Sequence, residues 1–222
     1  MNRTVYIPAD SVLLEADLAI PVGAKAIVLF AHGSGSSRRS PRNQYVAEVL
    51  RTAGLGTLLM DLLTKEEDAI YETRFDIALL TARLASATMW CVGQPQTKSL
   101  SVGYFGASTG AAAALKAAAA IPSIGAVVSR GGRPDLAESA LGRVQAPTLL
   151  IVGGNDDVVI ELNQQAYKQL RCEKRLTIVP GATHLFEEPG ALDEVARLAS
   201  EWFSRYLRSQ HSAAATQARK IS

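Results

Sequence analysis

The chain has 222 residues, 48% of them hydrophobic and 20% charged, so we expect one globular domain with a core of ordinary size. Its net charge of +2 is too small to favour a nucleic-acid partner. The first ten residues lack the apolar core of a signal peptide, and no apolar run is long enough to cross a bilayer. We therefore expect a cytoplasmic protein with no membrane partner.

The predicted elements begin with two strands, 5–7 and 12–20, joined at Pro8-Ala9-Asp10, and continue with an uninterrupted apolar strand at 26–31. Such uninterrupted runs are typical of a strand covered on both faces. Similar runs follow at 56–60, 100–105, 126–129, 148–152 and 176–179. Between them, apolar residues at three- and four-residue intervals predict helices at 43–53, 69–90, 109–120, 135–141, 159–170 and 191–207. This alternation predicts an α/β domain over residues 1–208, followed by a flexible polar tail over 209–222.

One motif stands at a strand-to-helix junction. Gly106-Ala107-Ser108-Thr109-Gly110 follows the apolar run 100–105 and precedes an alanine-rich helix. A serine on such a tight turn, with glycine two residues to either side, predicts a nucleophile elbow that lifts the hydroxyl out of the sheet. The alternative is that Ser108 only caps the following helix.

A serine hydroxyl needs a base to take its proton. His184 follows the last strand, in a loop at the edge where parallel sheets place their ligands, and is the predicted base. His211 lies in the tail. His32 ends the third strand beside a glycine, where a structural or pocket-shaping role is expected.

The base in turn needs a carboxylate to orient it. The strand 148–152 is followed by Gly153-Gly154-Asn155-Asp156-Asp157, so either aspartate could reach His184 or could cap the next helix. Asp135, after the sixth strand, is a further candidate. The chain order Ser108, Asp156, His184 is the one expected for an α/β-hydrolase.

Two backbone amides are predicted to form the oxyanion hole, which holds the negative charge of the tetrahedral intermediate. One is the N–H of Thr109, at the start of a helix. The other is the N–H of Ser34 in His32-Gly33-Ser34-Gly35, although this segment could be a simple glycine turn.

Together, the opening hairpin, His32-Gly33, the elbow at Ser108, the Gly-Gly-Asn-Asp156 segment and His184 resemble the dienelactone hydrolase-like group of α/β-hydrolases. The resemblance implies an eight-stranded, mostly parallel sheet with an antiparallel second strand, and hydrolysis of an ester or lactone through an acyl-enzyme. It also favours Asp156 over Asp157. One feature departs from the family: dienelactone hydrolase proper uses a cysteine nucleophile, whereas this elbow carries a serine.

Arginines lie near the predicted pocket. Arg130 and Arg133 are in the loop after the sixth strand, where a pair of guanidinium groups could bind a substrate carboxylate, or could simply be solvated. A second group, Arg38, Arg39 and Arg42, follows the predicted oxyanion loop.

The predicted helices should cover both faces of the sheet. Only residues 131–146 separate the sixth and seventh strands, so this connection is too short for a large cap domain.

These observations predict a serine hydrolase that cleaves a small ester, lactone or related acyl compound. A small-molecule acyl substrate is the expected partner, and the protein is expected to be a monomer or homodimer. Cys91 and Cys172 have no metal-ligand or redox spacing, so we expect no metal and no cofactor, with both cysteines packed as small apolar residues. A thioesterase or peptidase with the same triad, or a non-catalytic binding module, remains the alternative.

Overall fold

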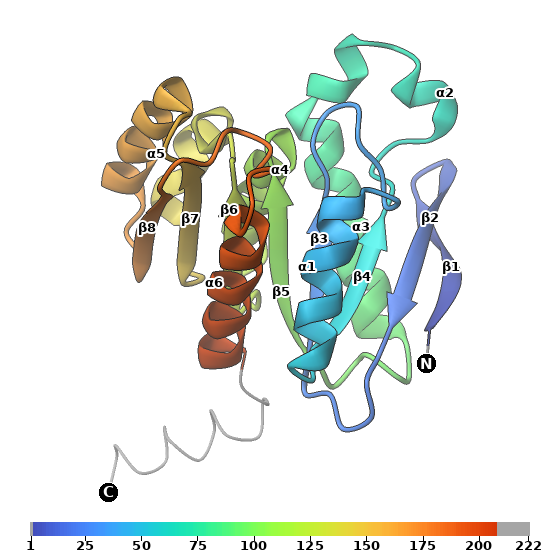
Figure 1. Cartoon of the computed structure of the whole chain (residues 1–222). Helices are drawn as coiled ribbons and strands as arrows, with labels where there is room; N and C mark the ends of the chain where they lie inside the picture. Colours follow the sequence, from blue (N-terminus) through green and yellow to red (C-terminus); the bar gives the residue numbers. More distant parts are fainter. Residues whose placement is uncertain (1, 208–222) are drawn as a thin grey trace, which may run out of the picture.

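The computed structural model describes residues 2–207, which build one eight-stranded sheet with helices on both faces (Figure 1). The predicted tail, 209–222, lies outside the described residues. The strands are β1 (Asn2–Ala9), β2 (Val12–Ala19), β3 (Ala26–Ala31), β4 (Gly56–Met60), β5 (Ser101–Ala107), β6 (Ala126–Arg130), β7 (Thr148–Gly153) and β8 (Lys174–Val179). Their order across the sheet is β1-β2-β4-β3-β5-β6-β7-β8. Strand β2 runs antiparallel to its neighbours β1 and β4, as predicted. The other six strands, in the order β4-β3-β5-β6-β7-β8, all pair in parallel.

The helices lie in two layers. They are α1 (Pro41–Thr52), α2 (Lys65–Asp68), the 3-10 helix η1 (Glu72–Phe75), α3 (Ile77–Gly93), α4 (Thr109–Ala120), the 3-10 segment η2 (Pro134–Arg143), α5 (Asp157–Gln169) and α6 (Ala191–Tyr206). Helices α1 and α6 cover one face of the sheet, and α3 and α4 cover the other (Figure 1). Two buried apolar clusters, one on each face, account for the uninterrupted apolar strands. Within residues 2–207 no helix combines the length and apolar content needed to cross a bilayer.

The carboxyl ends of the central strands lie at one edge of the sheet. Ala31 at the end of β3 is paired with Gly106 in β5, and Ala107 at the end of β5 is paired with Arg130 at the end of β6. Gly153 at the end of β7 is paired with Val179 at the end of β8. The loops that follow these strands therefore meet at that edge, and they carry the predicted site residues. Only η2 and its flanking turns connect β6 to β7, so no cap domain is inserted there.

The predicted helix at 69–90 is wrong at its start. Helix α3 begins only at Ile77, because the Asp76 carboxylate accepts a hydrogen bond from the Leu79 N–H and Asp76 has non-helical backbone angles. The preceding residues form α2 and η1 instead, which pass beyond the sheet edge beside the site (Figure 1). Pro8, predicted to lie in a turn, belongs to β1, an edge strand where a missing N–H is tolerated.

Candidate active site

Ser108 lies on a sharp turn between β5 and α4. Its backbone has φ 50° and ψ −122°, a strained conformation for any residue with a side chain. The flanking glycines make the turn possible: a Cβ on Gly106 would lie 2.5 Å from Ala111 Cα, and one on Gly110 would lie 2.2 Å from the Ala31 oxygen. Ser108 stands at the N-cap position of α4, yet its side chain makes no capping hydrogen bond. Its hydroxyl is thus not used as a helix cap.

His184 and Asp156 are brought into direct contact. The His184 Nδ1 lies 2.7 Å from the Asp156 Oδ2, and because a carboxylate oxygen accepts, the Nδ1–H donates. This bond leaves Nε2 as the nitrogen that can take a proton. Asp156 precedes α5 but makes no capping hydrogen bond, and Asp157, next to it, is exposed. The geometry therefore selects Asp156 as the partner of His184.

The loop after β6 lies between Ser108 and His184. The Ser108 N–H donates to the Arg130 carbonyl at 3.3 Å, and the Arg133 N–H donates to the Ser108 carbonyl at 3.1 Å. A Cβ on Gly131 would lie 3.0 Å from the His184 oxygen and 3.6 Å from its Cε1. Among the hydrogen bonds of residues 2–207, none joins the Ser108 hydroxyl to the His184 ring, and such bonds often tighten only when substrate is bound.

The two predicted oxyanion amides are linked through a side chain. Thr109 is the first residue of α4, so its N–H has no intrahelical acceptor and lies at the positive end of the helix dipole. The Ser34 N–H donates to the Thr109 Oγ1 at 3.0 Å. The structure thus places both residues together, with the Ser34 amide held by the Thr109 hydroxyl.

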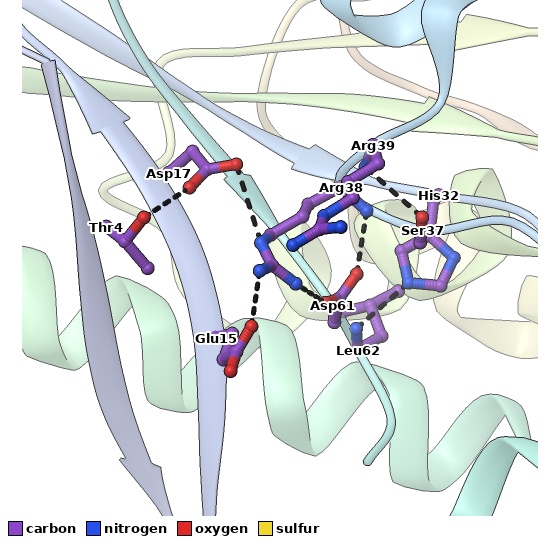
Figure 2. Close-up of polar contacts among 9 residues, drawn as sticks. All are labelled: Thr4, Glu15, Asp17, His32, Ser37, Arg38, Arg39, Asp61 and Leu62. Carbon is purple, nitrogen blue, oxygen red and sulfur yellow. Dashed lines mark hydrogen bonds and ion pairs between the residues drawn. The ribbon is translucent and has the colours of Figure 1, made fainter. Parts of the chain in front are cut away.

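His32 fixes the loop that carries Ser34. Its Nε2 accepts a hydrogen bond from the Leu62 N–H at 3.0 Å, so the ring carries its proton on Nδ1, which donates to the Gly33 carbonyl at 2.9 Å. Figure 2 shows the ring turned toward the Leu62 backbone, shortly after the end of β4. Burial lowers the pKa of His32, against smaller opposing effects of the Gly33 carbonyl and nearby carboxylates. His32 is therefore a neutral residue that holds the loop in place, which agrees with the structural role, one of the two predicted from the sequence.

Arg38 anchors the other end of the same loop (Figure 2). Its guanidinium contacts three carboxylates, those of Glu15, Asp17 and Asp61, and its backbone N–H donates to Asp61 Oδ1 at 2.7 Å. A cavity of about 320 Å³ opens beside this cluster and His32. Sequence reasoning missed the cluster, although the alternation of Glu15 and Asp17 along β2 puts both on one face. Within the described part of the chain, no group of three His, Cys, Asp or Glu side chains is arranged to hold a metal ion.

The comparisons with known proteins agree with this architecture. The model of the dienelactone hydrolase family matches residues 14–217. The chain belongs to the dienelactone hydrolase family. A solved dienelactone hydrolase from Anabaena variabilis is 62% identical to it, with a TM-score of 0.92 over 94% of this chain and 99% of that one. Est1E from Butyrivibrio proteoclasticus, solved with ferulic acid bound, shares the fold at 18% identity, with a TM-score of 0.78 over 91% of this chain and 98% of that chain.

Two relatives from Mycobacterium tuberculosis are longer than this chain. Each is 59% identical over 93% of this chain and 47% of its own length, and each is provisionally named a phosphoribosyl transferase. The chain therefore spans about half the length of these relatives.

In this member of the dienelactone hydrolase family, Arg130 and Arg133, the predicted carboxylate-binding pair, each contact a different protein side chain. Arg130 is 8% exposed and faces α1, because it follows Ala126 and Val128 on the same side of β6, and its guanidinium contacts the Asn43 side chain at 3.4 Å. Burial, with Arg42 nearby, lowers the pKa of Arg130 to about 10. The Arg133 guanidinium is occupied by Asp135, with two N–H groups donating to the carboxylate at 2.8 and 2.9 Å. That pairing also removes Asp135 as a partner for His184.

Neither cysteine lies at the candidate site. Cys91 is buried in α3, and burial raises the pKa of its thiol to about 12. Cys172 is only partly buried, so the prediction that both pack as buried apolar residues holds for Cys91 alone. The residue on the turn between β5 and α4 is Ser108, not a cysteine.

Proposed function

We propose that the protein is a serine hydrolase that cleaves a small ester, lactone or related acyl compound through an acyl-enzyme. One observation carries the proposal: the His184 Nδ1–H donates to Asp156 at 2.7 Å, at the same edge of the sheet as a serine held at φ 50° on a strand-to-helix turn. Membership of the dienelactone hydrolase family supports the hydrolase chemistry.

The reaction proceeds in two acyl-transfer steps. The Ser108 Oγ forms a bond to the carbonyl carbon while its proton passes to His184 Nε2, and the carbonyl oxygen becomes an anion beside the Thr109 amide. Collapse of this intermediate breaks the bond to the leaving alkoxide, which takes the proton from His184. Water then attacks the acyl-enzyme and loses a proton to His184. The bond to the Ser108 Oγ breaks, the serine oxygen takes that proton back from His184, and the acid leaves. Asp156 keeps the proton on Nδ1 throughout and stabilises the imidazolium.

The substrate assignment stays at the level of the acyl group. The esterase domain of a Rhodothermus marinus protein shares this fold, which supports an ester substrate, although a thioester or amide would meet the same triad. The Mycobacterium tuberculosis relatives, named phosphoribosyl transferases, are about twice as long as this chain. We therefore assign hydrolase chemistry to the region that this chain shares with them, and take no transferase activity from their name.

Fluorophosphonate labelling with peptide mass mapping tests the proposal. We expect one adduct, on the peptide that carries Ser108, and none in Ser108→Ala. Ser36→Ala, in the neighbouring loop, is the matched control and should label like the wild type. An adduct on another serine, or ester hydrolysis that survives in Ser108→Ala, would overturn the assignment.

A further inference from the structure

A side-chain hydroxyl links the two residues that are predicted to form the oxyanion hole. We propose that the Thr109 Oγ1–H donates directly to the developing oxyanion, alongside the Thr109 amide, and that the Ser34 amide acts through this hydroxyl. This inference rests on the proposed function, because it names a further catalytic group for the same reaction.

The direction of one hydrogen bond carries the argument. The Ser34 N–H can only donate, so at 3.0 Å the Thr109 Oγ1 is the acceptor and keeps its own proton for another partner. Within residues 2–207, Thr109 Oγ1 donates no hydrogen bond. A threonine inside a helix usually donates to the carbonyl four residues earlier, but Thr109 is the first residue of α4 and follows a strand and a turn. The hydroxyl proton is thus left for a ligand.

This hydroxyl neighbours the predicted oxyanion position along the chain. It belongs to the same residue as the predicted amide donor, directly after Ser108. The loop that carries Ser34 touches the nucleophile, since a Cβ on Gly33 would lie 2.9 Å from the Ser108 Cβ. Thr109 is only 3% exposed, so it is shielded from bulk water. A hydrogen bond to a forming charge is stronger in such a shielded site than in water.

A different role for the hydroxyl would be a latch that blocks the Ser34 amide and releases it when substrate binds. The anchoring of the loop argues against this role. Both ring nitrogens of His32 make hydrogen bonds, and the Ser36 N–H donates to the Gly33 carbonyl at 3.1 Å. The Arg38 guanidinium contacts three carboxylates (Figure 2). A fixed amide behind the hydroxyl polarises it and makes it a stronger donor.

Two variants test the inference. Thr109→Val has nearly the same shape but no hydroxyl, and we expect kcat for ester hydrolysis to fall roughly 100-fold with KM little changed. Thr109→Ser keeps the hydroxyl and should stay within about threefold of the wild type. A trifluoromethyl ketone, which forms a tetrahedral oxyanion on serine, should bind Thr109→Val more weakly by a similar factor, whereas a non-hydrolysable amide analogue of the substrate should bind it equally well.

Three outcomes would overturn the inference. Equal hydrolysis by Thr109→Val would mean that the hydroxyl does not contribute to the reaction, and faster hydrolysis would mean that it blocks the Ser34 amide. Equal losses in Thr109→Val and Thr109→Ser would point to packing. A loss of kcat without weaker ketone binding would exclude stabilisation of the oxyanion. If Thr109→Val does not fold, as judged by thermal unfolding, Thr109→Ala gives the same comparison. The proposed function fails separately, when wild-type protein is not labelled by fluorophosphonate.

Discussion

Asp156 and His184 are 28 residues apart in the chain, and the His184 Nδ1–H donates to the Asp156 Oδ2 over 2.7 Å. The two residues follow β7 and β8, which are parallel neighbours whose carboxyl ends meet at one edge. Asp156 stands at the first position before α5, where an aspartate usually caps the helix, but its carboxylate is turned to the imidazole instead.

The first prediction separates the two neighbouring aspartates. Asp156→Asn should lower kcat/KM by about 1,000-fold or more, because an amide no longer fixes the tautomer or stabilises the imidazolium. Asp157→Asn, at an exposed position, should keep activity within about threefold. Steady-state ester hydrolysis measures both. Full activity in Asp156→Asn together with loss in Asp157→Asn would reverse the assignment.

The second prediction concerns pH and His32. Burial lowers the pKa of His32 from 6.5, so below that pH the unfolded chain binds a proton that the native chain does not. Stability contributed by neutral His32 is therefore present above pH 6.5 and lost as the pH falls below it, by at most about 1.4 kcal/mol per pH unit. His32→Gln should be less stable at pH 7 and should lose less stability between about pH 7 and pH 5.

Urea unfolding at several pH values measures this difference. Every other histidine remains in both proteins, so the difference between the two slopes isolates His32. Parallel stability curves for wild type and His32→Gln would show that His32 titrates alike in the native and unfolded states.

The third prediction tests the role of Arg130. Arg130 is buried, and within residues 2–207 its guanidinium has no carboxylate partner and one hydrogen bond, to the Asn43 side chain, so Arg130→Met should leave the free energy of unfolding unchanged or raised. KM should change by the same factor for a neutral and an anionic ester of matched size. A rise in KM confined to the anionic ester would restore the predicted substrate-binding role.

The fourth prediction concerns the anchor of the oxyanion loop. Arg38→Met leaves the carboxylates of Glu15, Asp17 and Asp61 without their cation, and we expect it to destabilise the fold by about 1–3 kcal/mol, less than for a fully buried ion pair because the carboxylates are partly exposed. Arg39→Met, at the exposed neighbouring residue, should change stability by less than about 0.5 kcal/mol.

Denaturant unfolding at neutral pH compares the Arg38 and Arg39 variants. Equal stability of the two variants would mean that the Arg38 cluster does not hold the loop.

The fold itself was predictable from the sequence. Uninterrupted apolar strands alternating with amphipathic helices require a sheet covered on both faces, and the elbow around Ser108 is a local pattern whose glycines are needed where the chain passes close to its neighbours. The order of Ser108, Asp156 and His184, each just after a strand, follows from the same local reading. These features depend on residues that are close together in the chain.

Which side chains meet depends on the folded chain. Arg130 lies in a strand that is apolar on both sides, so the alternation of residues along the strand did not reveal that it faces α1. The hydrogen bond from Ser34 to the Thr109 hydroxyl and the contact of Arg38 with three carboxylates join residues from distant parts of the chain. Such contacts depend on how strands are ordered and how their loops are fixed, which residue type and local spacing do not encode.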